Sequence, residues 1–474
     1  MASERAGFLS EGALLETLAR GNKDVYFFTK DLSGALNPFE YRYSRRPGTV
    51  PELRRVVPLN APDFARTCEF EFDIAGDVFA DTTVLIDLPS WLPPVEAALN
   101  RETGVSILAT SGRSYGYTRG IGYFLFSKVQ LYQDKILLQE FSGDALWGSR
   151  LSRGSLNSAY LDQALTGMTD VSGDAITLSK NATPTTLRLS LPMLGGIRGI
   201  PSIGMRQQTF RLKLELRPLE ECIECSDAAI TYPMPWNEAS YTVVTPTTTY
   251  TVKPLPRERI ARPTITLETR HLYFDPDSRA ELQKKKHELP YSIFYENEFT
   301  FGGLDYKSAN EAQQQFPTFV RDIDASHPAS RMFWFLRTRD DLIRGRRWST
   351  SGLNNPYYQY LSLLIAARDR EVLSTPLIWN VLTPFAKEER SPGFAVGEMN
   401  WDLGAVDARE APHEYCPEGS INFSTAEKPV VLIYLRTPNA SQTFKTEVVE
   451  MTLVVESWTL FEIEDGRGAL QYGN

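Results

Sequence analysis

The dominant pattern along this chain is a two-residue alternation of apolar and polar side chains. It is clearest over residues 210–216, where Phe and Leu alternate with Arg, Lys and Glu. A half-buried strand produces this period because successive side chains point to opposite faces of a sheet. The same alternation predicts strands over residues 68–74, before a Gly76-Asp77 turn, and over 187–191.

Longer apolar stretches predict further strands near the C-terminal end. Residues 428–436 and 448–461 are rich in β-branched and aromatic side chains, and Thr437-Pro438-Asn439 between them is a turn signal. The chain also contains 31 Gly and 30 Pro, which punctuate it into short elements. Many strands bounded by turns, without alternating helices, indicate an all-β fold of sandwiches or jelly rolls.

Two segments have helical patterns. Residues 12–20 place three leucines on one stripe and end at Gly21. Residues 275–286 begin with Asp-Pro-Asp and end with Lys-Lys-Lys, which matches the polarity of the helix dipole. We interpret the second helix as a connector, and the Pro- and Thr-rich residues 220–263 as a long surface insertion.

Composition and charge narrow the possible classes of protein. The 474 residues are 42% hydrophobic and 11% aromatic, which is typical of a packed globular protein. The net charge of −9 argues against a nucleic-acid coat, which needs basic clusters. Two compact basic clusters exist, Lys284–Lys286 and Arg344–Arg347, and we interpret both as solvated surface.

Membrane and secretory signals are not evident. No apolar run approaches the roughly 18 residues of a membrane span, and the first residues do not have the pattern of a secretory signal. The four cysteines are too few for a disulfide framework in so long a chain, so we expect free thiols.

Metal-binding motifs are incomplete. Cys222 and Cys225 have the spacing of half a zinc site, but a second thiol pair is missing, and His413 with Cys416 lies far along the chain. The four histidines include no His-x-His pair. We therefore expect two free cysteines in a loop, and neither a metal nor a cofactor.

Catalytic motifs are equally weak. Gly112–Gly116 matches the Gly-x-Ser-x-Gly pattern around Ser114, but a glycine-rich stretch follows where a nucleophile elbow needs a helix. The adjacent carboxylates Asp340 and Asp341 favour a solvated turn over a glycosidase pair. We expect no catalytic residue. N-glycosylation patterns begin at Asn181, Asn422 and Asn439, each interpreted as a polar turn residue.

Short motifs follow one another in a characteristic order over nearly the whole chain. They are Gly12–Leu15, Gly21–Tyr26, Asn37–Phe39, Tyr41–Arg46, Gly76-Asp77, Leu88-Pro89, Ile121-Gly122, Val129–Ile136, Gly143-Asp144 with Trp147, Leu191–Leu194, Leu272–Asp275, Arg279, His287-Glu288, His327-Pro328 with Phe333–Phe335, Arg368–Arg370, Thr383–Phe385, Gly419–Ser424 and Leu470–Asn474. This order resembles the major capsid proteins of nucleocytoplasmic large DNA viruses, the group of the iridoviruses and the algal and amoebal giant viruses.

The resemblance implies a double jelly roll, two eight-stranded antiparallel sandwiches in one chain. It implies an N-terminal arm and helix over 1–21, a first jelly roll over 22–274 with the insertion at about 220–263, a linker helix over 275–286, and a second jelly roll over 287–474. Agreement between the strand pattern and the family supports this division.

The resemblance also implies a structural function rather than an enzymatic one. Three chains would present six rolls as a pseudo-hexagonal homotrimer that tiles an icosahedral shell. The partners would be the chain itself, minor capsid and penton proteins, and the internal membrane side through the N-terminal helix, with no direct nucleic acid and no small-molecule substrate. The location would be the virion, after assembly in the host cytoplasm.

Three alternatives remain. A minor capsid paralogue would share the fold without forming the lattice. A carbohydrate-binding double sandwich would use exposed aromatic residues such as Trp236 or Tyr241. A jelly-roll hydrolase would depend on Ser114 or a carboxylate pair.

Overall fold

Strand β9 (Thr209–Leu216) shows how the alternation becomes a buried sheet face. Phe210, Leu212 and Leu214 are buried, whereas Glu215 is exposed. β9 pairs antiparallel with β2 (Thr67–Asp73), whose Cys68 faces the same core. Both strands were predicted from the sequence pattern, and both are confirmed.

The computed structural model describes residues 49–73, 75–153, 165–167, 175–184, 186–191, 199–205, 208–284, 286–302, 318–351, 357–388, 396–401, 419–435, 448–464 and 467–470. All of them belong to one compact unit, Thr49–Asn474.

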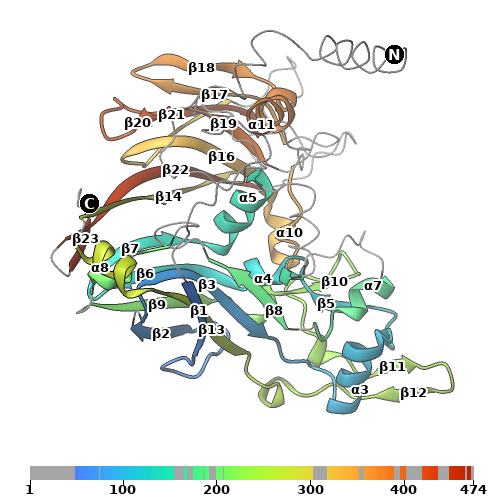
Figure 1. Cartoon of the computed structure of the whole chain (residues 1–474). Coiled ribbons are helices and arrows are strands. Elements are labelled where there is room, and N and C mark those ends of the chain that lie inside the picture. Colours follow the sequence, from blue (N-terminus) through green and yellow to red (C-terminus); the bar gives the residue numbers. More distant parts are fainter. Residues whose placement is uncertain are drawn as a thin grey trace, which may run out of the picture. The chain divides into compact units, whose positions relative to one another are not determined.

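The principal strands before residue 275 form two four-stranded antiparallel sheets that face one another (Figure 1). One has the order β1 (Thr49–Val56), β13 (Thr264–Phe274), β3 (Val78–Asp87), β8 (Leu187–Ser190). The other has the order β2, β9, β6 (Phe126–Gln133), β7 (Ile136–Phe141).

Two further sheets follow residue 286. One has the order β14 (His287–Phe301), β22 (Val449–Glu464), β16 (Pro328–Thr338), β19 (Gly397–Asn400), with β20 (Ile421–Asn422) and β23 (Arg467–Leu470) paired at its margins. The other has the order β15 (Thr318–Asp322), β21 (Val430–Leu435), β17 (Tyr358–Ile365), β18 (Arg368–Ser374).

Both halves have the same topology. If the principal strands of each half are numbered one to eight in chain order, one sheet runs 1-8-3-6 and the facing sheet runs 2-7-4-5. This arrangement is the jelly roll, so the chain is an all-β double jelly roll. We call the two halves the first and second roll.

Helix α8 (Pro276–Lys284) connects β13 to β14 and confirms the predicted connector helix. The Asp275 carboxylate accepts a hydrogen bond from the Ser278 amide at 2.8 Å and caps the first turn. The cap fixes the point at which the chain leaves one roll for the other.

The remaining α-helices among the described residues have at most 11 residues. They are α3 (Pro94–Ala98), α4 (Ile121–Phe124), α5 (Gly143–Arg153), α7 (Ala175–Lys180), α10 (Arg339–Ile343) and α11 (Thr383–Glu388). Within the described part of the chain, none is long and apolar enough to cross a membrane. Helices α5 and α11 occupy equivalent places, because each comes after the fifth strand of its roll.

Residues 220–263 are more ordered than the expected surface insertion. They contain β10 (Ile223–Cys225), β11 (Tyr241–Val244) and β12 (Thr249–Val252). β10 pairs with β5 (Tyr115–Tyr117), and β11 pairs with both β12 and β4 (Ile107–Ala109). Periodicity did not indicate these strands because each is only three or four residues long.

Candidate functional site

The outer face of the large sheet of the second roll is buried against the first roll. In β16, Met332, Trp334 and Leu336 pack into the core of the second roll, whereas Phe333 and Phe335 join the apolar core of the first. A strand buried on both faces explains why this segment is a continuous apolar run rather than an alternation. The junction between the rolls is therefore the candidate functional site.

Helix α5 is the element of the first roll that contacts β16. Trp147 packs against Phe335 with ring centroids 5.3 Å apart. A Cβ atom on Gly148 would lie 2.8 Å from the Phe335 ring and 2.9 Å from the Phe333 ring. Glycine inside a helix ordinarily costs about 1 kcal/mol relative to alanine. Here the close approach of the helix to the sheet requires it.

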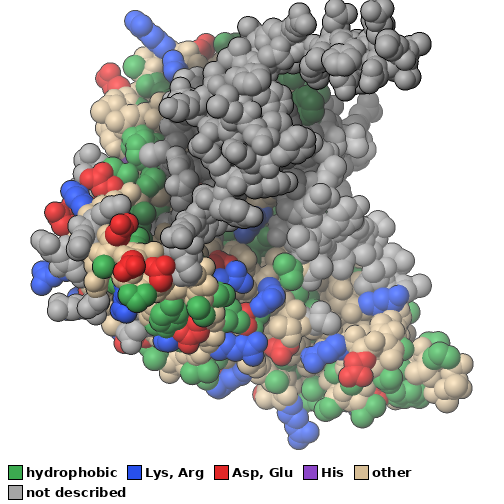
Figure 2. Space-filling view, viewed as in Figure 1, with side chains coloured by type: hydrophobic (Ala, Val, Ile, Leu, Met, Phe, Trp, Pro, Cys, Tyr) green, Lys and Arg blue, Asp and Glu red, His purple; other side chains and the backbone are tan. Residues whose placement is uncertain are grey.

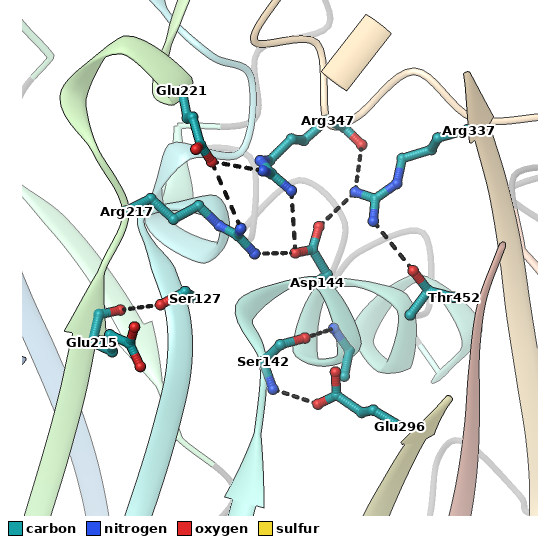
Figure 3. Close-up of polar contacts among 11 residues, drawn as sticks. Ser127, Ser142, Asp144, Glu215, Arg217, Glu221, Glu296, Arg337, Arg347 and Thr452 are labelled. Atoms are coloured by element: carbon teal, nitrogen blue, oxygen red, sulfur yellow. Dashed lines mark hydrogen bonds and ion pairs between the residues drawn. The ribbon is translucent and has the colours of Figure 1, made fainter. Parts of the chain in front are cut away.

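Buried charges surround the first turn of α5 (Figure 3). Arg337 of β16 donates to Asp144, with Nη1 2.5 Å from Oδ1, and Arg217 beside β9 donates to the other carboxylate oxygen. Arg347 of the second roll lies 3.6 Å from the same oxygen and donates to Glu221 at 2.9 Å. One carboxylate thus binds arginines of both rolls.

The charge of Asp144 is set by its neighbours. Burial alone raises the pKa of this carboxyl, but the charges of Arg337, Arg217 and Arg347 outweigh burial and hold the pKa well below its usual range. The carboxylate is therefore ionised, and it also lies in the first turn of α5, where negative charge is favourable.

A second buried ion pair fixes the C-terminal half of α5. Arg331 of β16 donates through Nε to Glu456 of β22 at 2.6 Å. Its two terminal nitrogens donate to the hydroxyls of Ser152 and Ser149 at 2.6 and 3.0 Å, and Glu398 of β19 lies 3.7 Å away. Arg331 and Arg337 lie at the two ends of the apolar run of β16. Arg337 therefore binds the first turn of α5, and Arg331 binds its C-terminal half.

Strands β7 and β14 continue the junction. Gln139 donates to the carbonyl of Ser292 at 2.8 Å, and Phe141 packs against Phe294 with ring centroids 5.8 Å apart. These contacts place the fifth strand of the first roll against the first strand of the second. The junction is therefore asymmetric, with a different surface on each side.

Glu296 of β14 sits where this contact meets α5. Its carboxylate accepts a hydrogen bond from the amide of Ser142, the residue before the helix (Figure 3). Burial raises the pKa of Glu296 to about 7; the hydrogen bonds with Ser142 oppose this shift, and the negative charges of Asp144 and Glu298 add to it. Glu296 is a titratable group inside the junction.

The basic cluster Arg344–Arg347 is not a solvated surface, which corrects the interpretation from sequence. Arg346 donates to the carbonyl of Cys225 at 3.2 Å, and Arg347 binds Glu221 and Asp144. On the face shown in Figure 2, acidic and basic side chains are interspersed rather than separated by sign. The cluster bridges the two rolls.

The two cysteines at this bridge are buried. Cys222 and Cys225 are free thiols, as expected, but Cys225 lies in β10 and Cys222 directly precedes it, so the expected loop is wrong. Burial raises the pKa of Cys222 to about 12, which disfavours the thiolate that a metal site requires.

Glu224, between Cys222 and Cys225 in the sequence, also connects the two rolls. Its carboxylate accepts hydrogen bonds from the Thr118 hydroxyl of the first roll at 2.7 Å and from the Trp348 indole of the second at 2.5 Å.

The other charged motifs have local structural roles. Lys286, after α8, pairs with Glu462 of β22 at 2.6 Å. Asp340 and Asp341 lie in the first turn of α10 rather than in a turn between strands, and the Asp341 amide donates to the capping hydroxyl of Thr338 at 3.2 Å. Asp340 is exposed and lies 3.6 Å from Arg344.

The remaining candidates do not converge on one site. Ser114 is buried and is followed by strand β5 rather than by a helix. Asn181 lies in a turn, and Asn422 lies exposed in β20. Tyr241 is buried, and its hydroxyl donates a hydrogen bond to the Pro235 carbonyl at 2.7 Å. The exposed position expected for Tyr241 is therefore wrong.

Several sequence predictions fall outside the described residues. They are the helix over 12–20, the Thr437–Asn439 turn, Asn439, and the pair His413 and Cys416. Within the described residues, no cluster of three or more His, Cys, Asp or Glu side chains could hold a metal ion.

The contacts at the junction hold the two rolls together. Aromatic packing, two buried arginine clusters and a strand contact fix the two rolls at one relative orientation. Asp144, Trp147 and Arg347 belong to motifs recognised in the sequence, whereas Arg217, Arg331, Arg337 and Glu296 do not. The one sequence signal for the missed residues was an arginine at each end of the apolar run Met332–Leu336.

Comparisons with known proteins give the fold a context. No protein-family model and no curated protein sequence matches the chain. Among solved structures, the PBCV-1 virus capsid has a TM-score of 0.65 at 12% identity, covering 92% of this chain and 100% of that one. The Faustovirus major capsid protein has a TM-score of 0.60 at 12% identity, covering 90% and 93%. The mavirus major capsid protein has a TM-score of 0.52 at 11% sequence identity, and the match covers 92% of this chain and 93% of that one. The chain shares the double jelly-roll fold of these capsid proteins.

Proposed function

We propose that this chain is the major capsid protein of a large double-stranded DNA virus. The observation that carries the proposal is the repeated jelly roll in one chain, with the two rolls joined through a buried, charge-filled junction. Its structural neighbours with the same fold are capsid components. Such a protein has a structural function, because two rolls held at one relative orientation form a building block of defined shape.

The building block is a homotrimer in this proposal. Three chains contribute six rolls, which approximate a hexagon and can tile an icosahedral facet. A trimer with closed symmetry also covers sheet edges that would otherwise promote open-ended association. The further partners are neighbouring capsomers, minor capsid and penton proteins, and the internal membrane side through the N-terminal segment. The location is the virion, after assembly in the host cytoplasm.

The native mass tests this proposal directly. The purified full chain is measured by light scattering after gel filtration, and its outline is examined by negative stain. We expect three times 53.5 kDa, about 160 kDa, with hexagonal outlines. A well-folded 53.5 kDa monomer at every concentration would contradict self-assembly of this chain.

The carbohydrate-binding alternative loses support from the structure. Tyr241 is buried, and Trp236 is half-buried with the Arg257 guanidinium 5.4 Å from its ring centroid. Neither is an exposed platform for stacking a sugar. A glycan array remains the appropriate test if the native mass contradicts the capsomer.

A further inference from the structure

The first turn of α5 has the beginning of a capping box. The Ser142 hydroxyl accepts a hydrogen bond from the Ala145 amide at 2.9 Å, and the Ser142 carbonyl accepts one from the Leu146 amide at 3.0 Å. Ser142 is therefore the N-cap residue of the helix. In a capping box, a Glu or Gln three residues later accepts the amide hydrogen of the N-cap residue. That position holds Ala145, which is buried and has no carboxylate.

Glu296 supplies the missing acceptor from the second roll. It lies in β14, 154 residues from Ser142 along the chain, and its carboxylate accepts the hydrogen bond of the Ser142 amide. In Figure 3, the Glu296 carboxylate is directed at Ser142, whereas the arginines of the junction are directed at Asp144. The Ser142 amide therefore has this partner only while the two rolls are docked.

The charged groups nearest to Glu296 lie on several elements. Asp144 of α5 and Glu298 of its own strand are negative, and both disfavour a second negative charge at Glu296. Lys128 of β6 is positive and interacts with Glu296, but it pairs with Glu140 of β7 at 2.7 Å. The one cation on this side is therefore shared with another carboxylate.

The sheet of the second roll contributes similarly paired charges. On β22, Val454 lies opposite Glu296, and Glu456 two residues further on is bound by Arg331 of β16 at 2.6 Å. Arg337 of β16 is bound to Asp144. An ionised Glu296 is thus surrounded by cations that already have carboxylate partners.

We propose that Glu296 caps α5 across the junction and makes the docking of the second roll on this helix sensitive to pH. When the carboxyl is protonated, its carbonyl oxygen still accepts the Ser142 amide. When it is ionised, its charge is repelled by Asp144, and the contact weakens. The pKa of Glu296, raised to about 7 chiefly by burial, sets the range, so docking loses stability as the pH rises through 7. The inference concerns a single chain and does not rest on the proposed capsomer.

Hydrogen exchange of the α5 amides in the full-length protein tests the proposal. Separation of α5 from β14 would expose Glu296 to water and return its pKa to the ordinary value of 4.5. The equilibrium constant of this opening should then rise roughly thirtyfold between pH 5.5 and pH 8. Mass spectrometry of peptides covering residues 143–153 measures it, after correction for the intrinsic effect of pH on exchange. An opening equilibrium that is the same at both pH values would overturn the proposal.

Two substitutions separate the charge of Glu296 from its role as a cap. Glu296→Gln keeps a carbonyl acceptor for the Ser142 amide and cannot ionise, so its α5 protection should be independent of pH. Glu296→Leu removes the acceptor, so protection should be roughly fivefold lower than in Glu296→Gln at every pH. The matched control Glu298→Gln changes an exposed carboxylate of the same strand and should retain the pH dependence of the wild type.

The pair Glu296→Gln and Glu298→Gln decides the outcome even if Glu296→Leu does not fold. A pH dependence retained in Glu296→Gln would assign the effect to another group and overturn the proposal. Equal protection in Glu296→Gln and a folded Glu296→Leu protein would show that residue 296 does not cap the helix. A monomer in light scattering would contradict the proposed capsomer only, because the exchange measurement requires just one folded chain.

Discussion

The β1-β13-β3-β8 sheet of the first roll and the β14-β22-β16-β19 sheet of the second roll have the same strand order, but their outer faces differ in burial. On the outer face of the first, Glu268 is held by Arg55 and Arg188, two arginines that extend into solvent. On the outer face of the second, Arg331 and Arg337 are buried with their partners against α5. The same pairing of arginine and carboxylate therefore occurs in two environments.

The residues on the outer face, rather than the topology, decide which sheet becomes a junction. An exposed ion pair contributes about 0–1 kcal/mol to stability. Breaking a buried pair costs about 3–5 kcal/mol, since it leaves a charge without compensation in a low dielectric. Substitutions on the two sheets should consequently differ several-fold in effect.

The largest effect is expected at Asp144. Asp144→Ala leaves Arg217, Arg337 and Arg347 buried without their shared carboxylate, and should lower the free energy of unfolding by about 3–5 kcal/mol. Urea denaturation followed by fluorescence measures the change. Asp340→Ala, which removes an exposed carboxylate near Arg344, is the control and should cost under about 1 kcal/mol. Equal costs for the two variants would refute the assigned role of the junction.

Gly148→Val tests the packing of α5 on β16. The new side chain would collide with the Phe333 and Phe335 rings, so we expect a loss of about 1–3 kcal/mol despite the better helix propensity of valine over glycine. Thermal unfolding measures the loss. Arg150→Ala, at an exposed position of the same helix, should change stability by at most about 0.5 kcal/mol. A neutral Gly148→Val would show that α5 does not approach the sheet closely.

Glu296→Gln tests the titratable group in the junction. The folded-state pKa of about 7 lies above the ordinary value of 4.5, so the folded protein keeps a proton that the unfolded chain releases. The contribution of Glu296 to wild-type stability should fall as pH rises from 4.5 to 7 and then level off, and Glu296→Gln should remove this decline of about 3 kcal/mol. Urea midpoints from pH 4.5 to 8 measure it. Glu298→Gln, an exposed neighbour on β14, should retain the decline, and parallel profiles for wild type and Glu296→Gln would contradict the assignment.

Arg55→Ala should have the smallest effect. Arg188 still binds Glu268 when Arg55 is removed, and Arg55 is largely exposed, so we expect a loss of about 0.5 kcal/mol. Differential scanning calorimetry against Arg188→Ala provides the comparison. A loss as large as that of Asp144→Ala would mean that the outer face of the first roll is more buried than the single chain indicates.

The sequence pattern predicted some of the principal strands of the sandwiches. Alternation identified β2, β8 and β9, the longer apolar stretches identified β21 and β22, and the polarity of residues 275–286 identified α8. These features are local, since a half-buried strand or a capped helix has its signature within a few residues. The jelly-roll strand order was predicted from the resemblance to the capsid family. The sequence of a single strand does not indicate which other strand it pairs with.

The junction could not be predicted in the same way. Arg347 resembled a member of a solvated basic cluster because its partners, Asp144 and Glu221, are distant in sequence. Cys225 and the short strand β10 were hidden in a Pro- and Thr-rich segment whose order depends on pairing with β5. Long-range contacts of this type override local composition. The apolar run of β16, bounded by two arginines, was the one local sign of a sheet buried on both faces.

A cryo-electron microscopy reconstruction of the assembled full-length protein would show every junction between rolls at once. If the chain builds the proposed capsomer, the map contains three chains and a ring of six rolls. Within each chain, α5 packs on the sheet that contains β16, with Asp144 bound to Arg217 and Arg337. An assembly of another number of chains, or a chain whose two rolls separate at α5, would contradict the account.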